Sequence, residues 1–378
     1  MRTLYFITSF NSPQSGRDMK CVPSSLTYNN YLIRSFEQLQ DTKVKVVSSS
    51  ISNKRVYWTN KSIMNGNHEE IYFSSFPKTW GKWAVRLSLL WLYAQMFFYL
   101  LFSAKKDDLI IIYHGHGLSF FYKGFKRFLH SKIYYVVGEI FSAVWDLGDD
   151  AIKTECSHLK GAEGYIFSND IMPRLFSAVQ KSVVCYGSYD YSLTPKIKSD
   201  IIHVLYAGKI STDIINDAFI ALDVIKYLPD NYMMHIAGYG EEIDLIELKK
   251  RVDSINREAN KTIAIYEGNL SGEEYENLLS ICQIGLCTRT LRNDLSNYCF
   301  PSKTLVYLNH DILPICPRID NLLESRIADR LEFVDGDLSP MVIAKTIEAA
   351  SLKLNGYNNE SIIRLLNDDF LKELKQML

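Results

Sequence analysis

Short apolar runs alternate with longer amphipathic stretches along most of this chain, and this alternation limits its fold more than any other feature. Runs such as 109–113 and 202–207 have the length and the apolar composition of buried strands. The stretches between such runs carry apolar residues at helical spacing, as 243–256 does. Because strands that alternate with helices form parallel sheets covered by helices, the sequence predicts an α/β fold.

The alternation predicts six strands in each half of the chain, with helices in the gaps. In the first half we expect strands at 3–8, 44–48, 109–113, 132–137, 165–168 and 182–184, and a first helix at 27–39. In the second half we expect strands at 202–209, 232–238, 262–266, 284–287, 313–316 and 331–334. The expected helices of that half are 217–226, 243–256, 273–281, 302–308, 340–350 and 360–378.

A polar segment, 189–199, separates the two halves; it contains Pro195 and has no hydrophobic periodicity. A chain of 378 residues is long enough for two domains, each with its own core. We therefore expect a first domain over 1–190 and a second over 200–355. The final segment, 356–378, should form a helix that packs on the core.

Glycine-containing turns follow three of the strands expected in the second half. Their sequences are Ala207-Gly208-Lys209, Ala237-Gly238-Tyr239-Gly240 and Glu267-Gly268-Asn269-Leu270. Glycine lets the backbone turn tightly or approach a ligand closely, although any one such turn is more often an ordinary connection. Open α/β sheets bind ligands at the carboxyl ends of their strands, so the three turns together indicate a ligand-binding edge.

The run Pro301-Ser302-Lys303 lies where a loop should become a helix. Proline at the first helical position loses no hydrogen bond, because that N–H would be unpaired in any case. The amides of Ser302 and Lys303 would then point free at the positive end of the helix dipole, beside a lysine, which suits a phosphate. The alternative is an ordinary capped surface helix.

In this order and spacing, the motifs resemble the donor domain of GT-B glycosyltransferases, most of all family 4 and its bacterial cell-surface polysaccharide relatives. The matching runs are 206–209, 236–240, 266–271 and 300–308. The resemblance covers about 202–334 and is fainter over 1–187. It implies two Rossmann-like domains that face each other across a cleft, the first binding the acceptor and the second binding the nucleotide sugar.

The resemblance also implies a donor site in the second domain. It places the donor diphosphate against Gly208, Lys209, Ser302 and Lys303, with Gly238 and Pro301 in the adjoining turns and the base beside Glu267, Gly268, Asn269 and Leu270. Lys209 and Lys303 would then stabilise the charge that grows on the leaving diphosphate, which is a catalytic part that needs no metal.

The chain departs from the family pattern at two places. The family carries a second basic residue after the first strand of this domain, but 211–217 contains no lysine or arginine. Cys299, and Val306 or Tyr307, stand where the family usually has two glutamates. We therefore expect the ribose and the sugar to be contacted by Arg289, Asn297, Tyr298 and Tyr307.

Two residues in the first half are candidates for the acceptor side. His116 belongs to a loop after the strand 109–113, where His114 and His116 could ligate a metal; no carboxylate cluster accompanies them, so we expect a loop that lines the cleft and no metal. Glu139 stands at a strand end where the family often has a histidine facing the sugar. It could bind a sugar hydroxyl or act as general base, the alternative being a structural glutamate bound to a lysine.

Gly16 lies in a long polar loop, 9–23, between the first strand and the first helix. The resemblance puts there a loop that approaches the phosphate or the acceptor. A loop of this composition could equally be mobile and without a ligand.

Two stretches bear on membrane contact. The stretch 85–104 is near the length that spans a bilayer, but it contains Arg86 and Gln95 and leads directly into a strand. We expect a buried or half-buried helix there, with a transmembrane span and shallow membrane contact as the alternatives. The stretch Phe120–Leu129 interleaves aromatic residues with cations, which favours peripheral contact with the inner face of the cytoplasmic membrane. A helix packed on the sheet with solvated lysines is the alternative there.

These observations predict a glycosyltransferase of the hexosyltransferase type. It would move a sugar from a nucleotide-sugar donor to a glycan or lipid-linked glycan, with retention of configuration and without a metal or other cofactor, in surface polysaccharide biosynthesis. Two rivals remain: a degenerate GT-B protein that acts as a binding partner or scaffold, and a dinucleotide-dependent oxidoreductase, against which the absence of a GxGxxG fingerprint counts.

Composition restricts the partners and the compartment. A net charge of −1 gives no general attraction to nucleic acid. Seven cysteines, an odd number without CxxC pairs, fit a reducing compartment, and the apolar start at 1–7 is too short for a signal peptide. We therefore expect a cytoplasmic protein.

Overall fold

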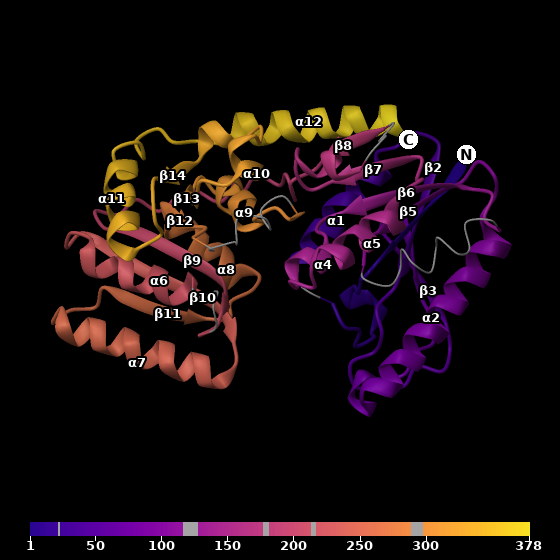
Figure 1. Ribbon diagram of the computed structural model, residues 1–378, viewed down its shortest axis with the longest axis horizontal. Coiled ribbons are helices and arrows are strands. Elements are labelled where there is room, and N and C mark those ends of the chain that lie inside the picture. Colours follow the sequence, from indigo (N-terminus) through magenta and orange to yellow (C-terminus); the bar gives the residue numbers. More distant parts are fainter. Residues whose placement is uncertain (22, 116–127, 177–180, 213–216, 289–297) are drawn as a thin grey trace. The chain divides into compact units, whose positions relative to one another are not determined.

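The structure is a computed structural model that describes residues 1–21, 23–115, 128–176, 181–212, 217–288 and 298–378. The chain divides into two compact units (Figure 1). The first unit comprises 1–188, 298–300 and 368–378, and the second comprises 189–297 and 301–367. Each unit is built on its own mainly parallel sheet, so the predicted α/β class with two Rossmann-like sheets is confirmed.

The first sheet has eight strands in the order β3-β4-β2-β1-β5-β6-β7-β8. The strands are β1 (Arg2–Thr8), β2 (Thr42–Ser48), β3 (Lys61–Asn65), β4 (His68–Tyr72), β5 (Leu109–Tyr113), β6 (Lys132–Val137), β7 (Gly164–Phe167) and β8 (Ser182–Val184). All neighbouring strands are parallel except β3, which runs antiparallel to β4. The central strands β1 and β5 are buried along most of their length, as their continuous apolar composition requires.

The hairpin of β3 and β4 was not predicted from the sequence. The two strands are joined at Gly66, whose φ of 58° lies in the left-handed region that glycine adopts readily. Strand β4 carries Glu69 and Glu70, so it does not read as an apolar strand. Glu70 is nevertheless fully buried, because it accepts hydrogen bonds from Ser12 and Tyr72 at 2.5 and 2.7 Å.

Helices α1 (Pro23–Glu37), α2 (Lys82–Ser103), α4 (Phe141–Val144) and α5 (Asp149–Leu159) belong to the first unit. Helix α1 begins four residues before the predicted start at Thr27, because Pro23 opens the helix instead of ending the preceding loop. Helix α1 packs on the sheet through an edge-to-face contact between Phe36 and Phe6, whose ring centres lie 5.2 Å apart.

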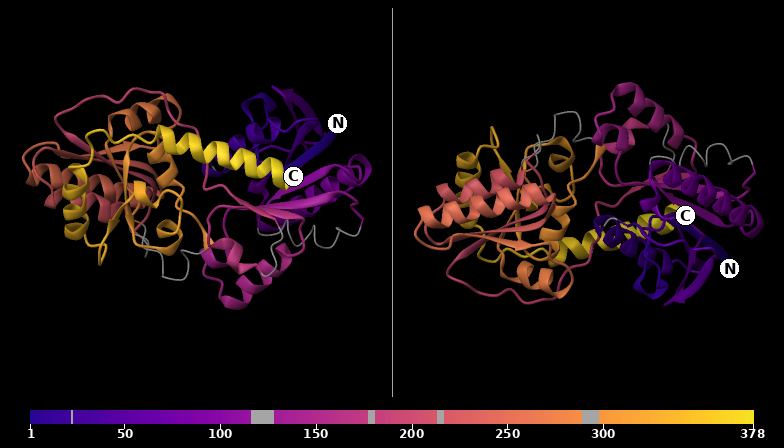
Figure 2. Two further views of the ribbon diagram at one scale, coloured as in Figure 1. Left: turned by 90° about the horizontal axis from the view of Figure 1, so that it is seen from above. Right: turned by 90° about the horizontal axis from the view of Figure 1, so that it is seen from below.

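The second sheet has six parallel strands in the order β11-β10-β9-β12-β13-β14. They are β9 (Ile202–Ile210), β10 (Tyr232–Gly240), β11 (Ala264–Gly268), β12 (Ile284–Leu286), β13 (Leu313–Pro317) and β14 (Glu332–Val334). The helices are α6 (Asp217–Val224), α7 (Glu242–Glu258), α8 (Glu273–Ile281), α9 (Lys303–Asn309), α10 (Asp320–Leu323) and α11 (Pro340–Ser351). They cover both faces of this sheet (Figure 2).

The core of the second unit lies between the sheet and the helices α6, α7 and α11. It includes Phe219 from α6, Leu248 from α7 and Ile347 from α11, packed on strand residues such as Val204 and Met234. The expected strands and helices of this half all occur, with ends that differ from the prediction by two residues or fewer.

The last helix, α12, covers Glu360–Met377, as the amphipathic pattern predicts. Residues from Asp368 onward belong to the first unit. There Phe370 is buried against Tyr31, with ring centres 5.8 Å apart, and Arg2 donates a hydrogen bond of 2.9 Å to the carbonyl of Leu378. The final turns therefore pack on a core made mostly by the first half of the chain.

Candidate functional site

The side chain of Lys303 lies directly over Gly208 at the carboxyl end of β9. A Cβ atom at Gly208 would be 2.9 Å from both Cε and Nζ of Lys303, which is closer than carbon atoms tolerate. Glycine at this strand end therefore leaves the space that the lysine occupies. The sequence predicted that Gly208 and Lys303 contribute to one site, and the structure brings the two residues together within the second unit.

Two neighbours hold the ammonium group of Lys303 in this position. Nζ lies 3.6 Å from Oδ2 of Asp217 and 3.9 Å from the centre of the Tyr206 ring. The Tyr206 hydroxyl is 2.7 Å from Oδ1 of Asp217, so it can donate its proton to this carboxylate. A quarter of the Lys303 side chain (26%) remains exposed to solvent. The result is a cation oriented by a carboxylate and an aromatic face on a side chain that is partly exposed.

Lys209 does not join this cluster through its side chain. Side chains alternate along a strand, so Lys209 points to the opposite face from Gly208 and Tyr206. It is exposed, and within the part of the chain that the structure describes its ammonium group forms no ion pair. The two cations predicted to share a diphosphate therefore differ: Lys303 is oriented by its neighbours, whereas Lys209 is free to adapt to a ligand.

Gly238 and Gly240 allow strands β9 and β10 to end side by side. Gly238 pairs with Gly208, and a Cβ atom at Gly238 would lie 1.8 Å from the Gly208 carbonyl oxygen. A Cβ atom at Gly240 would lie 2.4 Å from the Ile210 carbonyl oxygen. The Tyr266 hydroxyl donates to the Gly238 carbonyl at 3.0 Å. At Gly208, Gly238 and Gly240 the neighbouring ends of β9 and β10 thus pack closely and carry no side chain, and Gly208 lies directly against Lys303.

The helix start at Pro301-Ser302-Lys303 differs from the prediction in register. Lys303 is the first residue of α9, Ser302 precedes it, and the Thr304 amide donates to the Pro301 carbonyl at 3.0 Å. Helix α9 has seven residues, and a dipole over two turns is a weak source of positive charge. The ammonium group of Lys303, rather than the helix end, therefore makes this edge attractive to an anion.

Glu267, which was predicted to lie beside the base, is engaged inside the protein. Its Oε1 lies 2.6 Å from Nδ1 of His235, and Nε2 of His235 lies 2.8 Å from Nδ1 of His203. Burial and the neighbouring His235 lower the pKa of His203. In this geometry Nδ1 of His203 can donate to Nε2 of His235, and Nδ1 of His235 can donate to Glu267. Beyond Glu267, Asn269 is exposed, and Gly268 and Leu270 are partly exposed; these three residues are the accessible part of this strand end.

The prediction that Tyr307 contacts the nucleotide requires correction. Tyr307 is fully buried, and burial raises its pKa well above the ordinary value. Its hydroxyl accepts a hydrogen bond of 3.1 Å from the Ala207 amide, and its ring fills the space over Gly285, where a Cβ atom would lie 2.4 Å from the ring. Tyr307 therefore packs between α9 and the sheet, where a ligand cannot reach it.

Glu139 follows the carboxyl end of β6 and is partly exposed. It pairs with Cys299 in an isolated antiparallel bridge, and the next amide, that of Ile140, donates to the Tyr298 carbonyl at 2.9 Å. Burial and the charge of Glu139 raise the pKa of Tyr113. Tyr298 was predicted as a donor contact, but the structure assigns it to the first unit, against the segment that carries Glu139.

A buried hydrogen bond that was not predicted from the sequence supports this segment. Nε2 of His114 lies 2.5 Å from Oε1 of Glu155, and Glu155 also accepts hydrogen bonds from the Phe141 and Ser142 amides at 2.9 and 2.7 Å. Burial alone would raise the pKa of Glu155, but the hydrogen bonds from His114 and Ser142 outweigh it and lower the pKa to about 2. The pair fixes α4, which begins two residues after Glu139.

Gly16 lies in a loop that is tied to the β3–β4 hairpin. Its φ of 62° ends a short turn of 3₁₀ helix over Pro13–Ser15. Nζ of Lys61 donates to the Ser15 carbonyl at 2.5 Å, and the Arg17 guanidinium donates to the carbonyls of Phe73 and Thr59. The cations near Gly16 thus donate their hydrogen bonds to backbone carbonyls of the protein. This favours a structural role for the loop over a role in ligand binding.

Three predicted site residues, His116, Arg289 and Asn297, lie outside the described residues, as does most of the stretch Phe120–Leu129. Among the residues that are described, no group of three histidine, cysteine or carboxylate side chains could hold a metal ion.

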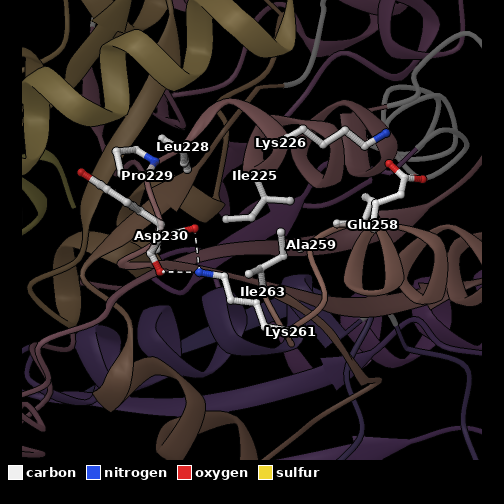
Figure 3. A pocket seen from close by; sticks show the side chains of 11 residues that line it. Ile225, Lys226, Leu228, Pro229, Asp230, Glu258, Ala259, Lys261 and Ile263 are labelled. Atoms are coloured by element: carbon white, nitrogen blue, oxygen red, sulfur yellow. Dashed lines mark hydrogen bonds and ion pairs between the residues drawn. The ribbon is translucent and has the colours of Figure 1, made fainter.

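A separate hollow of about 300 Å³ lies at the opposite end of the second sheet (Figure 3). It is lined by Tyr232 at the amino end of β10, and by Asp230 and Lys261, which form an ion pair of 2.7 Å. Because ligands of open α/β sheets bind at the carboxyl ends of strands, we assign the candidate site to the Gly208–Lys303 edge and not to this hollow.

Solved structures with the same fold cover almost the whole chain, whereas neither a protein-family model nor a curated protein sequence matches it. A sucrose-phosphate synthase from Thermosynechococcus elongatus has a TM-score of 0.69 at 13% identity, covering 100% of this chain and 98% of that one. An α,α-trehalose 6-phosphate synthase from Burkholderia multivorans has a TM-score of 0.66 at 11% identity, with 99% and 94% covered. Anabaena HepE, in complex with UDP and glucose, has a TM-score of 0.65 at 11% identity, with 100% and 98% covered.

These neighbours are GT-B glycosyltransferases, and the chain has the GT-B fold, as predicted. At identities of 11–13% the likeness concerns the fold, and it leaves the activity to be argued from the residues themselves.

Proposed function

We propose that the protein is a glycosyltransferase that binds a nucleotide-sugar donor at the carboxyl edge of its second sheet. The observation that carries this proposal is the placement of Lys303 over Gly208, where an oriented and partly exposed lysine side chain adjoins backbone that carries no side chain at Gly208 and Gly238. Such a surface lets a diphosphate approach closely, and the cation offsets its charge. The fold supports the proposal, because neighbours with this fold include a structure in complex with UDP and glucose.

The proposed reaction breaks the bond between the anomeric carbon of the sugar and the diphosphate oxygen. The electron pair stays on the diphosphate, so negative charge grows there in the transition state. Lys303, which is oriented by Asp217 and Tyr206, would stabilise this charge without reorganising. The side chain of Lys209 could turn toward the diphosphate and add a second positive charge. In the proposed mechanism these two lysines carry this task without a metal.

The acceptor side of the proposal rests on Glu139. An acceptor hydroxyl oxygen forms the new bond to the anomeric carbon and must lose its proton. Glu139 is a partly exposed carboxylate on a segment fixed by the buried pair of His114 and Glu155, so it has both the chemistry and the rigidity of a general base or a sugar-binding group. We propose retention of configuration and a glycan or lipid-linked glycan acceptor, as the family resemblance implies.

The same proposal places the protein in the cytoplasm. All seven cysteines lie in the described part of the chain, and none forms a disulfide. Five of them are buried, where they behave as small apolar side chains. Unpaired cysteines of this number fit a reducing compartment.

Titration calorimetry with UDP, GDP and dTDP, followed by an assay of donor hydrolysis, tests the proposed function. A glycosyltransferase should bind one of these nucleotides and hydrolyse the corresponding nucleotide sugar slowly when no acceptor is present. Binding without hydrolysis or transfer would instead indicate a degenerate protein that acts as a scaffold. Binding of NAD alone would overturn the proposal in favour of an oxidoreductase.

A further inference from the structure

Helix α2, whose course is drawn in Figure 1, exposes large apolar side chains along most of its length. Six of these side chains are between 49% and 82% exposed: Trp83, Leu87, Leu90, Trp91, Phe98 and Phe102. Their spacing of three, four, seven or eight residues puts them on one side of the helix. An exposed apolar patch of this extent is unusual on a protein that stays free in water, and it marks an interaction surface.

The opposite face of α2 is anchored to the first unit. Leu92, Met96 and Leu100 are fully buried there. At the border between the two faces, Gln95 donates to the Ser74 carbonyl at 2.9 Å, and the indole of the half-exposed Trp91 donates to the Ser74 hydroxyl at 2.9 Å. Among the described helices α2 alone is long and apolar enough to cross a membrane, but its packed face holds it on the protein. Helix α2 is therefore half-buried, as the sequence predicted. Its outer face is exposed to solvent.

The charged residues of the segment that carries this face are all positive. Between Ile71 and Lys106 the sequence contains no aspartate or glutamate, although the whole chain has a net charge of −1. The same segment contains five cations, all exposed: Lys78, Lys82, Arg86, Lys105 and Lys106. They lie before, within and after α2; at the carboxyl end of the helix the exposed Asp107 directly follows Lys105 and Lys106.

Aromatic residues extend the face beyond the helix. Trp58 and Trp80 are exposed on either side of Phe76, whose ring centre lies 6.0 and 6.1 Å from theirs. A groove of about 510 Å³ beside α2 is lined mainly by aromatic and alanine side chains, including Phe73 and Phe98. Tryptophan is enriched where a protein meets the interface of a bilayer, and a groove of this kind can take an acyl chain.

We infer that this surface docks on the face of a lipid bilayer that contains anionic lipids, with α2 lying in the plane of the interface. The apolar side chains would enter the headgroup boundary while the five cations pair with lipid phosphates. A second copy of this chain fits less well, because an antiparallel pair of α2 helices would bring Lys78 and Lys82 of one copy toward Lys105 and Lys106 of the other.

The inferred surface differs from the one expected from the sequence, which was Phe120–Leu129. The described end of that stretch nevertheless adjoins α2: Phe128 is exposed, and its ring centre lies 6.2 Å from that of Phe97 on α2. Membrane docking is independent of the proposed donor site, since every residue of this surface belongs to the first unit.

Co-sedimentation of the full chain with vesicles tests the inference. One set of vesicles contains phosphatidylcholine alone, and the other contains phosphatidylcholine mixed with phosphatidylglycerol. The protein should bind the mixed vesicles, and the binding should weaken as salt increases. The variant Leu87→Gln/Leu90→Gln/Phe98→Gln should bind at least about a hundredfold more weakly to them, because three apolar side chains no longer enter the interface.

The charge variant Lys78→Gln/Lys82→Gln/Arg86→Gln should lose about a hundredfold in binding to the mixed vesicles, since each cation near an anionic surface contributes about a fivefold gain in binding. The matched control Leu193→Gln/Leu352→Gln changes exposed leucines elsewhere and should bind as the wild type does. All variants should keep the wild-type affinity for nucleotide, which separates a failure of this inference from a failure of the proposed function.

Two results would overturn the inference. One is wild-type protein that stays in the supernatant with both kinds of vesicle. The other is a dimer in sedimentation velocity, without vesicle binding, that the triple apolar variant dissociates; this would assign the face to a second copy.

Discussion

The ammonium group of Lys303 lies 3.6 Å from a carboxylate oxygen of Asp217, and these residues open the helices α9 and α6 that follow different strands. The lysine that we propose to bind the diphosphate thus already has an anionic partner. The partner orients the lysine, but it also offsets part of the charge that a ligand would feel. Nucleotide binding should therefore depend on both members of the pair, in opposite directions.

Replacing Lys303 by alanine should weaken binding of the nucleoside diphosphate by about 1.5–3 kcal/mol, the range for a hydrogen bond to a charged group. Titration calorimetry measures the change. Lys261→Ala is the matched control, because Lys261 pairs with Asp230 at the opposite end of the same sheet and should leave the affinity unchanged. Equal affinities of the Lys303 variant and the wild type would show that Lys303 does not bind the diphosphate.

The variant Asp217→Asn should bind the nucleotide about fivefold more tightly, or by about 1 kcal/mol, because a negative charge near the diphosphate is lost. The asparagine can still accept the Tyr206 hydroxyl, and the Tyr206 ring still orients Lys303. The same titration, repeated at high salt, should show a smaller difference. Weaker binding by the variant would contradict this expectation. It would show that the carboxylate helps binding by positioning Lys303 more than it hinders binding by repelling the diphosphate.

Alanine substitutions at Gly208 and Gly238 should have different effects. At Gly238 the new methyl group would meet the Gly208 carbonyl oxygen at 1.8 Å, so the strands must separate, and we expect a loss of stability of about 3 kcal/mol or more. At Gly208 the methyl group meets the flexible end of Lys303, which can move away. Its φ of 157° still strains an alanine, so Gly208→Ala should lose less stability than Gly238→Ala and should also weaken nucleotide binding. Urea unfolding and calorimetry on both variants distinguish the two outcomes.

Glu139→Gln should leave the affinity for the nucleotide unchanged and lower the rate of transfer about 10²–10⁴-fold, the range for removal of a general base. The change keeps the size of the side chain, so the bridge to Cys299 should persist. Single-turnover transfer with a saturating donor measures the rate. A variant that transfers at the wild-type rate would show that Glu139 is a structural residue.

Acid should destabilise the protein through Glu155. Its pKa is about 2 in the folded protein against 4.5 for the free side chain, so the unfolded state binds the proton more tightly. The stabilisation is therefore complete above about pH 4.5 and is lost as the pH falls from 4.5 toward 2. Glu155→Gln should flatten this part of the curve of unfolding free energy against pH, measured by urea denaturation. A curve parallel to that of the wild type would contradict the assignment.

The sequence predicts most of the sheet architecture because its strands are continuous apolar runs, such as Leu109–Tyr113 and Ile202–Ile210. The hairpin at Lys61–Tyr72 escapes this reasoning. Its polar residues are satisfied by partners far away in the chain: Glu69 pairs with Lys43 and Lys45, and Glu70 accepts from Ser12. A carboxylate that is buried and paired looks the same in the sequence as one that is solvated.

In the candidate site, too, some residues were predicted from the sequence and others were not. The family resemblance implied that Gly208 and Lys303 contribute to one site, and both residues do lie at element ends on the carboxyl edge of the sheet. Asp217 and Tyr206 were not predicted, since the ion pair and the ring contact depend on side-chain directions. Tyr307 was assigned wrongly for a related reason: it lies four residues after Lys303, on the same side of α9, and that side faces the sheet.

Strand β3 gives the first sheet a border that resists pairing with another chain. Side chains of β3 alternate between partly and fully exposed, and Lys61 at its start is charged. The opposite border, β8, has only three residues. Short or charged edge strands are poor templates for an incoming strand. Should concentrated protein associate in the absence of lipid, the assemblies should therefore be held by side chains of α2, should dissolve in mild detergent, and should show no gain in β-structure.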